Sequence, residues 1–213
     1  IKKHPKRIQF LRMQQKLKDE WKEKNDNAKE KGHIYHERQE NKVNFNKFRI
    51  VEGGHVRPLA DTSGLPRSGG NKINVSSSLP DGVYAEILVK NHKLKMSGQI
   101  DYTFIETING VRYVDIDDYK TNEKLTFSNQ WQTFLAPIDF LEHHKFNIYR
   151  IQILLYAEMF RAYGYVPRNL TLTYHPNPQV APKVYGIHPF TECTTDPIKL
   201  MLTSRKLYLE SLS

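Results

Sequence analysis

Three segments in the middle of the chain have the mixture of apolar and polar residues that is typical of β-strands. Residues 83–90, 99–107 and 111–119 are rich in β-branched and aromatic residues, and an Asn109-Gly110 pair separates the last two. A two-residue type I′ turn needs a positive φ at both central positions, so Asn-Gly between two such segments is the strongest short-range signal for a β-hairpin. The pattern therefore predicts three strands, of which the second and third form a hairpin.

Other segments have the spacing of helices. Residues 5–40 contain no glycine before Gly32 and many Lys, Glu and Gln residues, which predicts a helix that ends at Gly32 and a second helix over 33–47. After the hairpin, the pattern predicts helices at 149–163 and 197–209, with strands at 170–174 and 183–187 between them.

This order of elements predicts one α/β domain over residues 1–213, with a central mixed β-sheet flanked by helices. Residues 53–82 are rich in Gly, Ser, Pro and Asn and are expected to form a long loop. No stretch approaches the roughly 18 apolar residues of a membrane span. We therefore expect a cytoplasmic protein without a membrane partner, which for a viral protein means the cytoplasm of the host.

The chain carries an excess of positive charge, with a formal net charge of +9 and a pI of about 9.4. The excess favours a polyanionic partner. Residues 1–31 alone hold eleven Lys or Arg against five acidic residues, a net charge of +6. This basic N-terminal helix is either a phosphate-binding surface or the solvated face of an ordinary helix, and charge alone does not decide between them.

The predicted hairpin brings two acids together. With Asn109 and Gly110 as the turn, the numbers of opposed residues sum to 219, which places Asp101 opposite Asp118. Lys120 lies two residues further and leaves the same face of the strand. Because directly opposed like charges destabilise a sheet, the two acids need a compensating cation. Lys120 supplies part of that charge, and a bound Mg²⁺ or Mn²⁺ ion would supply the rest.

Two alternatives compete with this interpretation. A register slipped by one residue opposes Asp101 to Asp117 or Tyr119 instead, and an ordinary solvent-facing hairpin needs no metal ion. Asp115 and Asp117 point to the other face of the strand, where we expect solvated acids without a chemical role.

Several motifs follow one another in an order known from nucleases. Gly98-Gln99-Ile100-Asp101 and Asp118-Tyr119-Lys120-Thr121 resemble the G-x-x-D … D-x-K-T core of the PD-(D/E)XK superfamily. Gln152-Ile153-Leu154-Leu155-Tyr156 matches the Q-x-x-x-Y motif of its RecB-like branch, and Gly32-His33-Ile34-Tyr35-His36-Glu37 resembles the G-x-x-x-H-E motif of that branch. The resemblance covers about residues 32–174, and the stretch that leads into Gln152 is similar to phage exonucleases.

The resemblance implies a restriction-endonuclease-like core and a metal-dependent deoxyribonuclease. An exonuclease of phage or viral origin is the expected type, and Mg²⁺ or Mn²⁺ is the expected cofactor. These ions prefer hard oxygen ligands. The resemblance assigns metal binding to Asp101, Asp118, the backbone carbonyl of Tyr119, His36 and Glu86. His33 competes with His36 for this role, and Glu86 is alternatively a structural ion-pair partner.

The resemblance also assigns roles to the remaining motif residues. Lys120 would orient the attacking water, stabilise the transition state or accept a proton. Gln152 and Tyr156 share one helix face and would line the active site, the alternative being simple core packing. Candidate nucleic-acid contacts, each weak by itself, are Lys124, Arg150, Arg161, Tyr35 and Trp131.

Other functions compete with an exonuclease. One is a structure-specific or nonspecific endonuclease, and another is a non-catalytic nucleic-acid-binding protein or a component of a virion or replication complex. The expected partners are DNA and other phage, replication or recombination proteins, although the composition does not exclude RNA. The single cysteine, Cys193, cannot hold the iron–sulfur cluster that some relatives of this branch carry.

Overall fold

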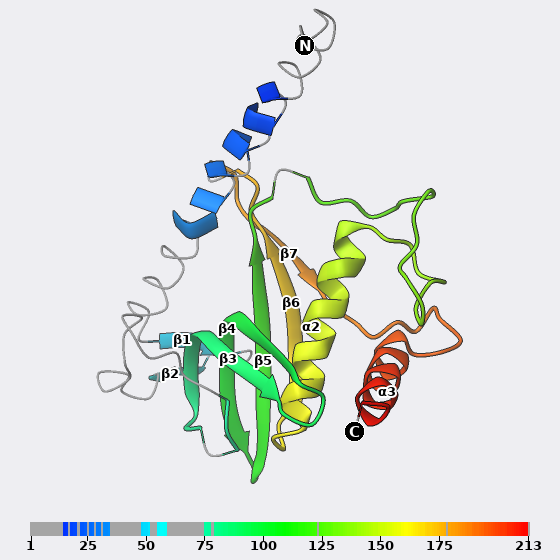
Figure 1. Cartoon of the computed structure of the whole chain (residues 1–213). Helices are drawn as coiled ribbons and strands as arrows, with labels where there is room; N and C mark the ends of the chain where they lie inside the picture. Colours follow the sequence, from blue (N-terminus) through cyan, green and yellow to red (C-terminus); the bar gives the residue numbers. More distant parts are fainter. Residues whose placement is uncertain are drawn as a thin grey trace, which may run out of the picture.

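A computed structural model shows an α/β protein with a five-stranded mixed sheet flanked by helices (Figure 1). The structure describes residues 15–16, 18–20, 22–24, 26–27, 29–30, 32–34, 48–51, 55–58, 75–77, 79–122, 124–177 and 179–212. No helix within these residues is long and apolar enough to cross a membrane.

The sheet has the strand order β3-β4-β5-β6-β7. Strands β3, β4 and β5 form an antiparallel meander, β6 lies parallel to β5 and β7 is antiparallel to β6. Because parallel neighbours need a crossover, helix α2 connects β5 to β6. The bounds of these elements are Gly82–Asn91 for β3, Met96–Ile108 for β4, Val111–Lys120 for β5, Lys145–Arg161 for α2, Val166–Tyr174 for β6 and Lys183–Gly186 for β7.

The core lies between the sheet and helix α2, with α3 (Pro197–Glu210) beside α2 (Figure 1). Asp196 caps the start of α3 by accepting hydrogen bonds from two backbone N–H groups, and Pro197 occupies its first turn. The apolar stripe of α2 packs on the β-branched residues of the central strands. The side chains that are at most 1% exposed include Ile87, Val89, Ile100, Ile105, Val114, Ile116, Leu172, Ile153, Ala157 and Phe160.

The three predicted central strands, the two later strands and both later helices are all present within a few residues of their predicted bounds. Two expectations for the N-terminal part differ from the structure. Gly32–Ile34 are helical, so the predicted break at Gly32 is absent. A short strand, β2 (His55–Pro58), pairs with β1 (Phe48–Val51) within the segment expected to be loop from residue 53 onward. The predicted second helix over 33–47 lies mostly outside the described residues.

Candidate active site

The β4–β5 hairpin has the register that the Asn-Gly turn predicts. Both turn residues have positive φ, 51° at Asn109 and 77° at Gly110. The opposed residues sum to 219 as far as the last ladder pair, Tyr102 with Asp117. The slipped register is therefore excluded over this ladder, and Asp101 and Asp118 are the next residues of β4 and β5 beyond its last pair.

Asp101 interacts with β5 through its side chain. The backbone N–H of Tyr119 donates to Asp101 Oδ2 at 2.7 Å. The carboxylate thus takes the place of the backbone carbonyl that would accept a hydrogen bond from this N–H in a regular ladder. This bond fixes Asp101 beside the D-x-K segment, next to both Asp118 and Lys120.

Asp118 and Lys120 lie on the same face of β5, as their spacing predicts. Asp118 is only 1% exposed, and its Oδ2 forms an ion pair with Lys120 Nζ. The Lys120 side chain is 21% exposed, so the ammonium lies at the edge of the buried region. A carboxylate buried to this degree is costly without positive charge next to it.

Strands β3 and β4 are both irregular at the same position, beside these acids. Buried positions are three residues apart at Tyr84 and Ile87 on β3, and at Ile100 and Thr103 on β4, although side chains of a regular strand alternate every two residues. The register between the two strands is the same on both sides of the irregularity. Both strands therefore change the face that they bury at one place, and Glu86 and Asp101 lie there, between the pairs Ala85–Tyr102 and Ile87–Ile100.

Glu86 has a backbone conformation that glycine usually adopts. Its φ is 54°, in the left-handed region that L-residues rarely occupy outside turns. A conformation of this kind persists only where the surrounding structure imposes it, and it is common at functional sites. The side chain of Glu86 is partly exposed, at the strand position next to the candidate metal ligands.

Helix α2 adds the Q-x-x-x-Y pair to the same site. Gln152 Nε2 donates to Tyr156 Oη at 2.7 Å, and Tyr156 is 7% exposed. The ring of Tyr156 lies against Gly98, where a Cβ atom would be 2.2 Å from its Cε1 atom. The glycine of the G-x-x-D motif is therefore required for helix α2 to pack this tyrosine on β4.

The pKa of Tyr156 reports how close its hydroxyl is to the charged groups. Burial raises the pKa above its usual value, and the hydrogen bond from Gln152 opposes this effect. The carboxylates of Asp118 and Asp101 raise it further, while the ammonium of Lys120 lowers it. The structure therefore brings five predicted catalytic residues into one site.

Tyr149 is a sixth residue of this site, which the sequence motifs did not assign. The Lys120 ammonium lies 5.1 Å from the centre of its ring, and its hydroxyl donates to Asn122 Oδ1 at 3.0 Å. Burial, the Asp118 carboxylate and Tyr174 raise its pKa. Tyr149 precedes Gln152 by three residues, so the helical spacing of the Q-x-x-x-Y motif was the signal for it.

The predicted nucleic-acid contacts have different positions. Arg150 donates to the backbone carbonyls of His188 and Pro189, forms an ion pair with Glu192 and lies 3.8 Å from the ring centre of Phe190. Its donors hold the segment after β7 against α2, which makes it a structural residue. Three other predicted contacts are exposed, namely Lys124, Arg161 and Trp131, of which Trp131 is 92% exposed. Arg161 forms an ion pair with Glu158 at the C-terminal end of α2.

The N-terminal motif is described only in part. Gly32 lies beside Thr121, the residue after Lys120, and a Cβ atom added to this glycine would be 3.5 Å from Thr121 Oγ1. The helix that contains Gly32 therefore reaches the site. His33 is exposed, whereas His36 and Tyr35 lie outside the described residues.

The expectation that Asp115 and Asp117 are solvated acids is wrong. Asp115 is 4% exposed and accepts two hydrogen bonds of 2.9 Å from Arg168. Asp117 accepts from Thr173 Oγ1 at 2.8 Å, while its Oδ1 atom is buried and has no partner among the described residues. Burial raises the pKa of Asp117, and the neighbouring Asp118 also raises it. The strand β6 covers both acids, which the β5 sequence alone could not reveal.

The donor set fits a divalent cation in part. Asp101 and Asp118 supply two carboxylates, and Mg²⁺ is commonly bound by one or two carboxylates together with water. Within the described ranges, however, no group of three His, Cys, Asp or Glu side chains could hold a metal ion. Glu86 therefore lies near the two aspartates in the strand register, but the three carboxylates do not form such a group.

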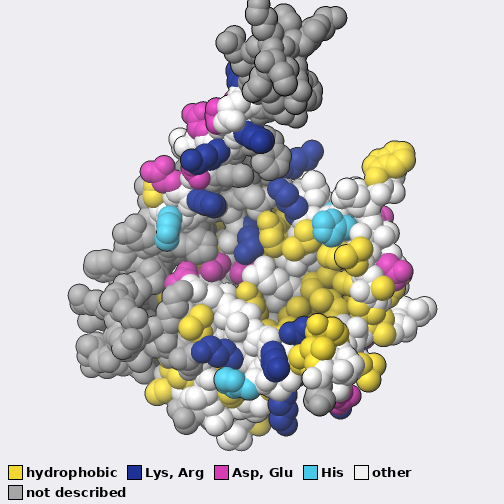
Figure 2. All heavy atoms as spheres, viewed as in Figure 1, with side chains coloured by type: hydrophobic (Ala, Val, Ile, Leu, Met, Phe, Trp, Pro, Cys, Tyr) yellow, Lys and Arg dark blue, Asp and Glu magenta, His cyan; other side chains and the backbone are white. Residues whose placement is uncertain are grey.

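Charged side chains gather on one face of the molecule. Figure 2 shows acidic side chains in the middle of this face, with Lys and Arg side chains beside them and toward the described part of the N-terminal helix.

Searches of protein-family models and of curated proteins find no match to this chain.

Proposed function

We propose that this chain is a metal-dependent deoxyribonuclease with a restriction-endonuclease-like core, and that it acts as an exonuclease. The observation that carries the proposal is the convergence of Asp101, Asp118 and Lys120 with the Gln152–Tyr156 pair. The Asp118–Lys120 ion pair and the bond from Tyr119 N–H to Asp101 fix the two acids, and the contact of Tyr156 with Gly98 fixes the helix pair above them. Two carboxylates with a lysine beside them are groups that can support metal-assisted hydrolysis of a phosphodiester.

The side chains have distinct roles in this proposal. Asp101 and Asp118 would hold a divalent cation, which when bound would supply Lewis-acid chemistry toward water and toward the negatively charged phosphate oxygens. Lys120 carries a positive charge at the edge of the buried region, where it can orient the water and stabilise the charge that develops on the phosphate. The Gln152–Tyr156 pair and Tyr149 keep Lys120 and the substrate strand in place.

The type of nuclease is tested with two forms of DNA. End-labelled linear DNA and covalently closed circular DNA are incubated with the protein and Mg²⁺, Mn²⁺ or EDTA. We expect digestion of linear DNA alone, and only with a metal ion. Nicked circles would show an endonuclease instead, and two intact substrates in every metal would refute the enzymatic proposal.

The role of Lys120 is tested by a matched pair of variants. Lys120→Ala should lower the cleavage rate roughly 100-fold or more, as expected when one charge-stabilising donor is removed, and should leave DNA binding nearly unchanged. Lys206→Ala is the control, because Lys206 is an exposed lysine on α3 that pairs only with Glu210 in its own helix. Parallel loss of binding and cleavage in Lys120→Ala would assign Lys120 to docking.

A further inference from the structure

The segment between β5 and α2 joins two parts of the proposed active site. It begins after Lys120, and it ends at Lys145, one turn before Tyr149. Its first part is tied to α2 by the hydrogen bond from Tyr149 to Asn122 Oδ1. Both ends of this loop therefore lie at the border of the site.

Hydrogen bonds around Asn129 hold the loop in one conformation. Asn129 Nδ2 donates to the backbone carbonyl of His143 at 2.8 Å, and its backbone N–H donates to Glu142 Oε2 at 2.9 Å. Thr133 and Glu142 form a β-bridge across the loop, and Asn129 Oδ1 accepts from the N–H of Trp131 at 3.2 Å. The tip is thus a built turn with Trp131 at its end.

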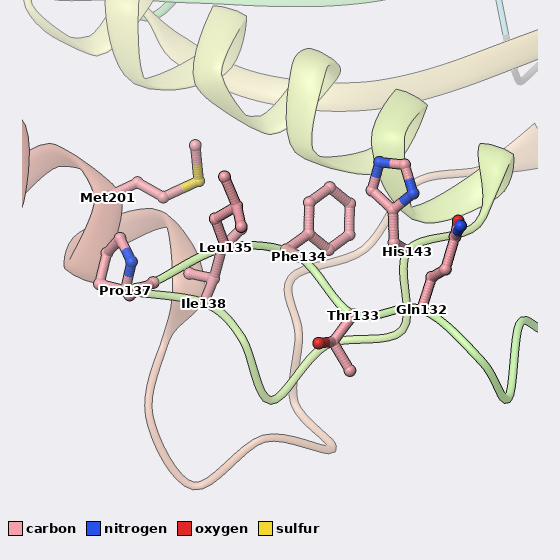
Figure 3. A pocket seen from close by; sticks show the side chains of 9 residues that line it. Gln132, Thr133, Phe134, Leu135, Pro137, Ile138, His143 and Met201 are labelled. Atoms are coloured by element: carbon pink, nitrogen blue, oxygen red, sulfur yellow. The ribbon is translucent and has the colours of Figure 1, made fainter.

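The aromatic residues at the base of the loop pack on the protein, unlike the ring at its tip. Phe127 contacts the rings of Phe146 and Tyr185, and Phe134 lies edge-on to His143 with ring centres 4.7 Å apart. Figure 3 shows Phe134 and His143 turned to the same side of the loop as α2. Trp131 is 92% exposed and has no side-chain partner in the part of the chain that the structure describes.

The surroundings of Trp131 match a nucleobase better than an apolar protein surface. Its neighbours in the chain are Ser128, Asn129, Gln130, Gln132 and Thr133, whose amides and hydroxyls can bind base edges and phosphates. None of these five is acidic, and the neighbouring Glu142 carboxylate accepts a hydrogen bond from the backbone N–H of Asn129. A single ring among polar groups presents a stacking face without a continuous apolar patch.

We propose that Trp131 stacks on an unpaired nucleobase of the substrate strand. The inference rests on the proposed nuclease function and names its substrate class: DNA whose nucleotides at the active site are single-stranded or frayed. A base that is paired within a duplex has no free face, so the ring selects single-stranded or frayed nucleotides. This preference agrees with digestion from an end.

Binding is tested with the full chain in EDTA, so that no DNA is cut. The DNA is a duplex with a single-stranded tail, and a blunt duplex of the same paired length is compared with it. Trp131→Ala should weaken binding of the tailed DNA about tenfold, the loss expected for one stacked base, and should change binding of the blunt duplex little. Trp131→Tyr should restore most of the affinity, because it keeps an aromatic face.

Leu135→Ala is the matched control. Leu135 is on the same loop and is 87% exposed, but it is aliphatic and lines a groove with Met201 of α3 (Figure 3). We expect the Leu135→Ala variant to bind both DNAs with the same affinity as the unaltered protein. Equal losses in Trp131→Ala and Leu135→Ala, or no loss in either, would overturn the proposal and leave the ring to a protein partner.

Fluorescence gives an independent measurement. The chain has two tryptophans, so Trp21→Phe leaves Trp131 as the only indole. Stacking should quench its emission when oligothymidylate is added in EDTA, and unchanged emission at saturating oligonucleotide would refute stacking. Because neither experiment involves cleavage, absent cleavage with intact quenching would refute only the nuclease proposal, whereas cleavage without quenching would refute only the role of Trp131.

Discussion

Glu86 shows how a single backbone angle shapes the site. Its φ of 54° costs an L-residue about 1 kcal/mol or more, while glycine adopts it freely. Glu86→Gly should therefore be more stable than Glu86→Ala by about 1 kcal/mol, because both lose the carboxylate and only glycine relieves the strain. Urea unfolding in EDTA measures the difference. An alanine variant as stable as the glycine variant would show that the angle carries no strain.

Gly98 offers a second test at the scale of one residue. A methyl group at this position would be 2.2 Å from Cε1 of Tyr156, and ring atoms of a buried tyrosine cannot move aside freely. We expect Gly98→Ala to destabilise the protein by about 1–3 kcal/mol, the usual cost of overpacking, and to lower cleavage. In a Tyr156→Ala background the same change should cost much less, which a double-mutant cycle of unfolding free energies measures.

Part of this detail could be predicted from the sequence because it depends on neighbours in the chain. The Asn109-Gly110 turn fixed the register that opposes Asp101 to Asp118, and helical spacing linked Gln152 to Tyr156. The positive φ of Glu86 could not be predicted, since it depends on β4 changing face at the same position. The structural role of Arg150 was equally hidden, because its partner Glu192 lies 42 residues away.

At the scale of elements, the parallel pair β5–β6 depends on an interaction between charged groups. The β5–β6 register shifts between Val114 and Ile116, and the intervening Asp115 accepts hydrogen bonds from Arg168 and from the backbone of Asn169. Burial raises the pKa of Asp115, but these hydrogen bonds outweigh it and leave the pKa below its ordinary value of 3.8.

Arg168→Ala should therefore destabilise the protein by about 3 kcal/mol, because it leaves Asp115 charged and buried. Chemical denaturation at pH 7 measures the loss. Since the folded state lowers the pKa of Asp115, the contribution of the Asp115–Arg168 pair to stability is present above pH 3.8 and disappears as the pH falls below that value. Lys206→Ala should change the unfolding free energy by less than about 0.5 kcal/mol, as expected for an exposed pair.

The start of helix α2 should respond to pH. His144 is the N-cap residue, and its Nδ1 accepts a hydrogen bond from the N–H of Asn147 at 3.2 Å. Burial lowers the pKa of His144 below its ordinary value of 6.5, although the nearby Glu142 opposes this shift. The cap therefore stabilises the protein above pH 6.5, and its contribution is lost as the pH falls below that value.

His144→Asn should remove this dependence, because asparagine caps a helix without titrating. When the pH is lowered from about 7.5 to about 5, the unfolding free energy of the unaltered protein should drop by about 1 kcal/mol relative to that of the variant. This is the usual contribution of an N-cap hydrogen bond to stability. Parallel pH curves for the two proteins would show that the cap does not titrate in this range.

At the scale of the whole molecule, the order of elements was predictable and their assembly only partly so. Each strand and helix after residue 82 follows from local periodicity, as the agreement of their bounds shows. The burial of Asp115 and the hydrogen bond from Thr173 to Asp117 depend on the parallel neighbour β6, which follows the α2 crossover in the chain. Sequence patterns identify which residues can do chemistry, whereas the strand after the crossover determines that Asp115 and Asp117 bind the side chains of Arg168 and Thr173.

The same division gives a prediction for the folded state as a whole. If Asp101 and Asp118 bind a divalent ion in the native state alone, the ion stabilises folding by mass action, about 2.7 kcal/mol at a concentration roughly one hundred times its dissociation constant. Mg²⁺ or Mn²⁺ should therefore raise the melting temperature of the unaltered protein, and the increase should vanish in Asp101→Asn. Asp139→Asn is the control, because Asp139 is exposed on the β5–α2 loop. An equal rise in Asp101→Asn and in the control would place the ion elsewhere, since only Asp101 is held beside Asp118 by the Tyr119 backbone.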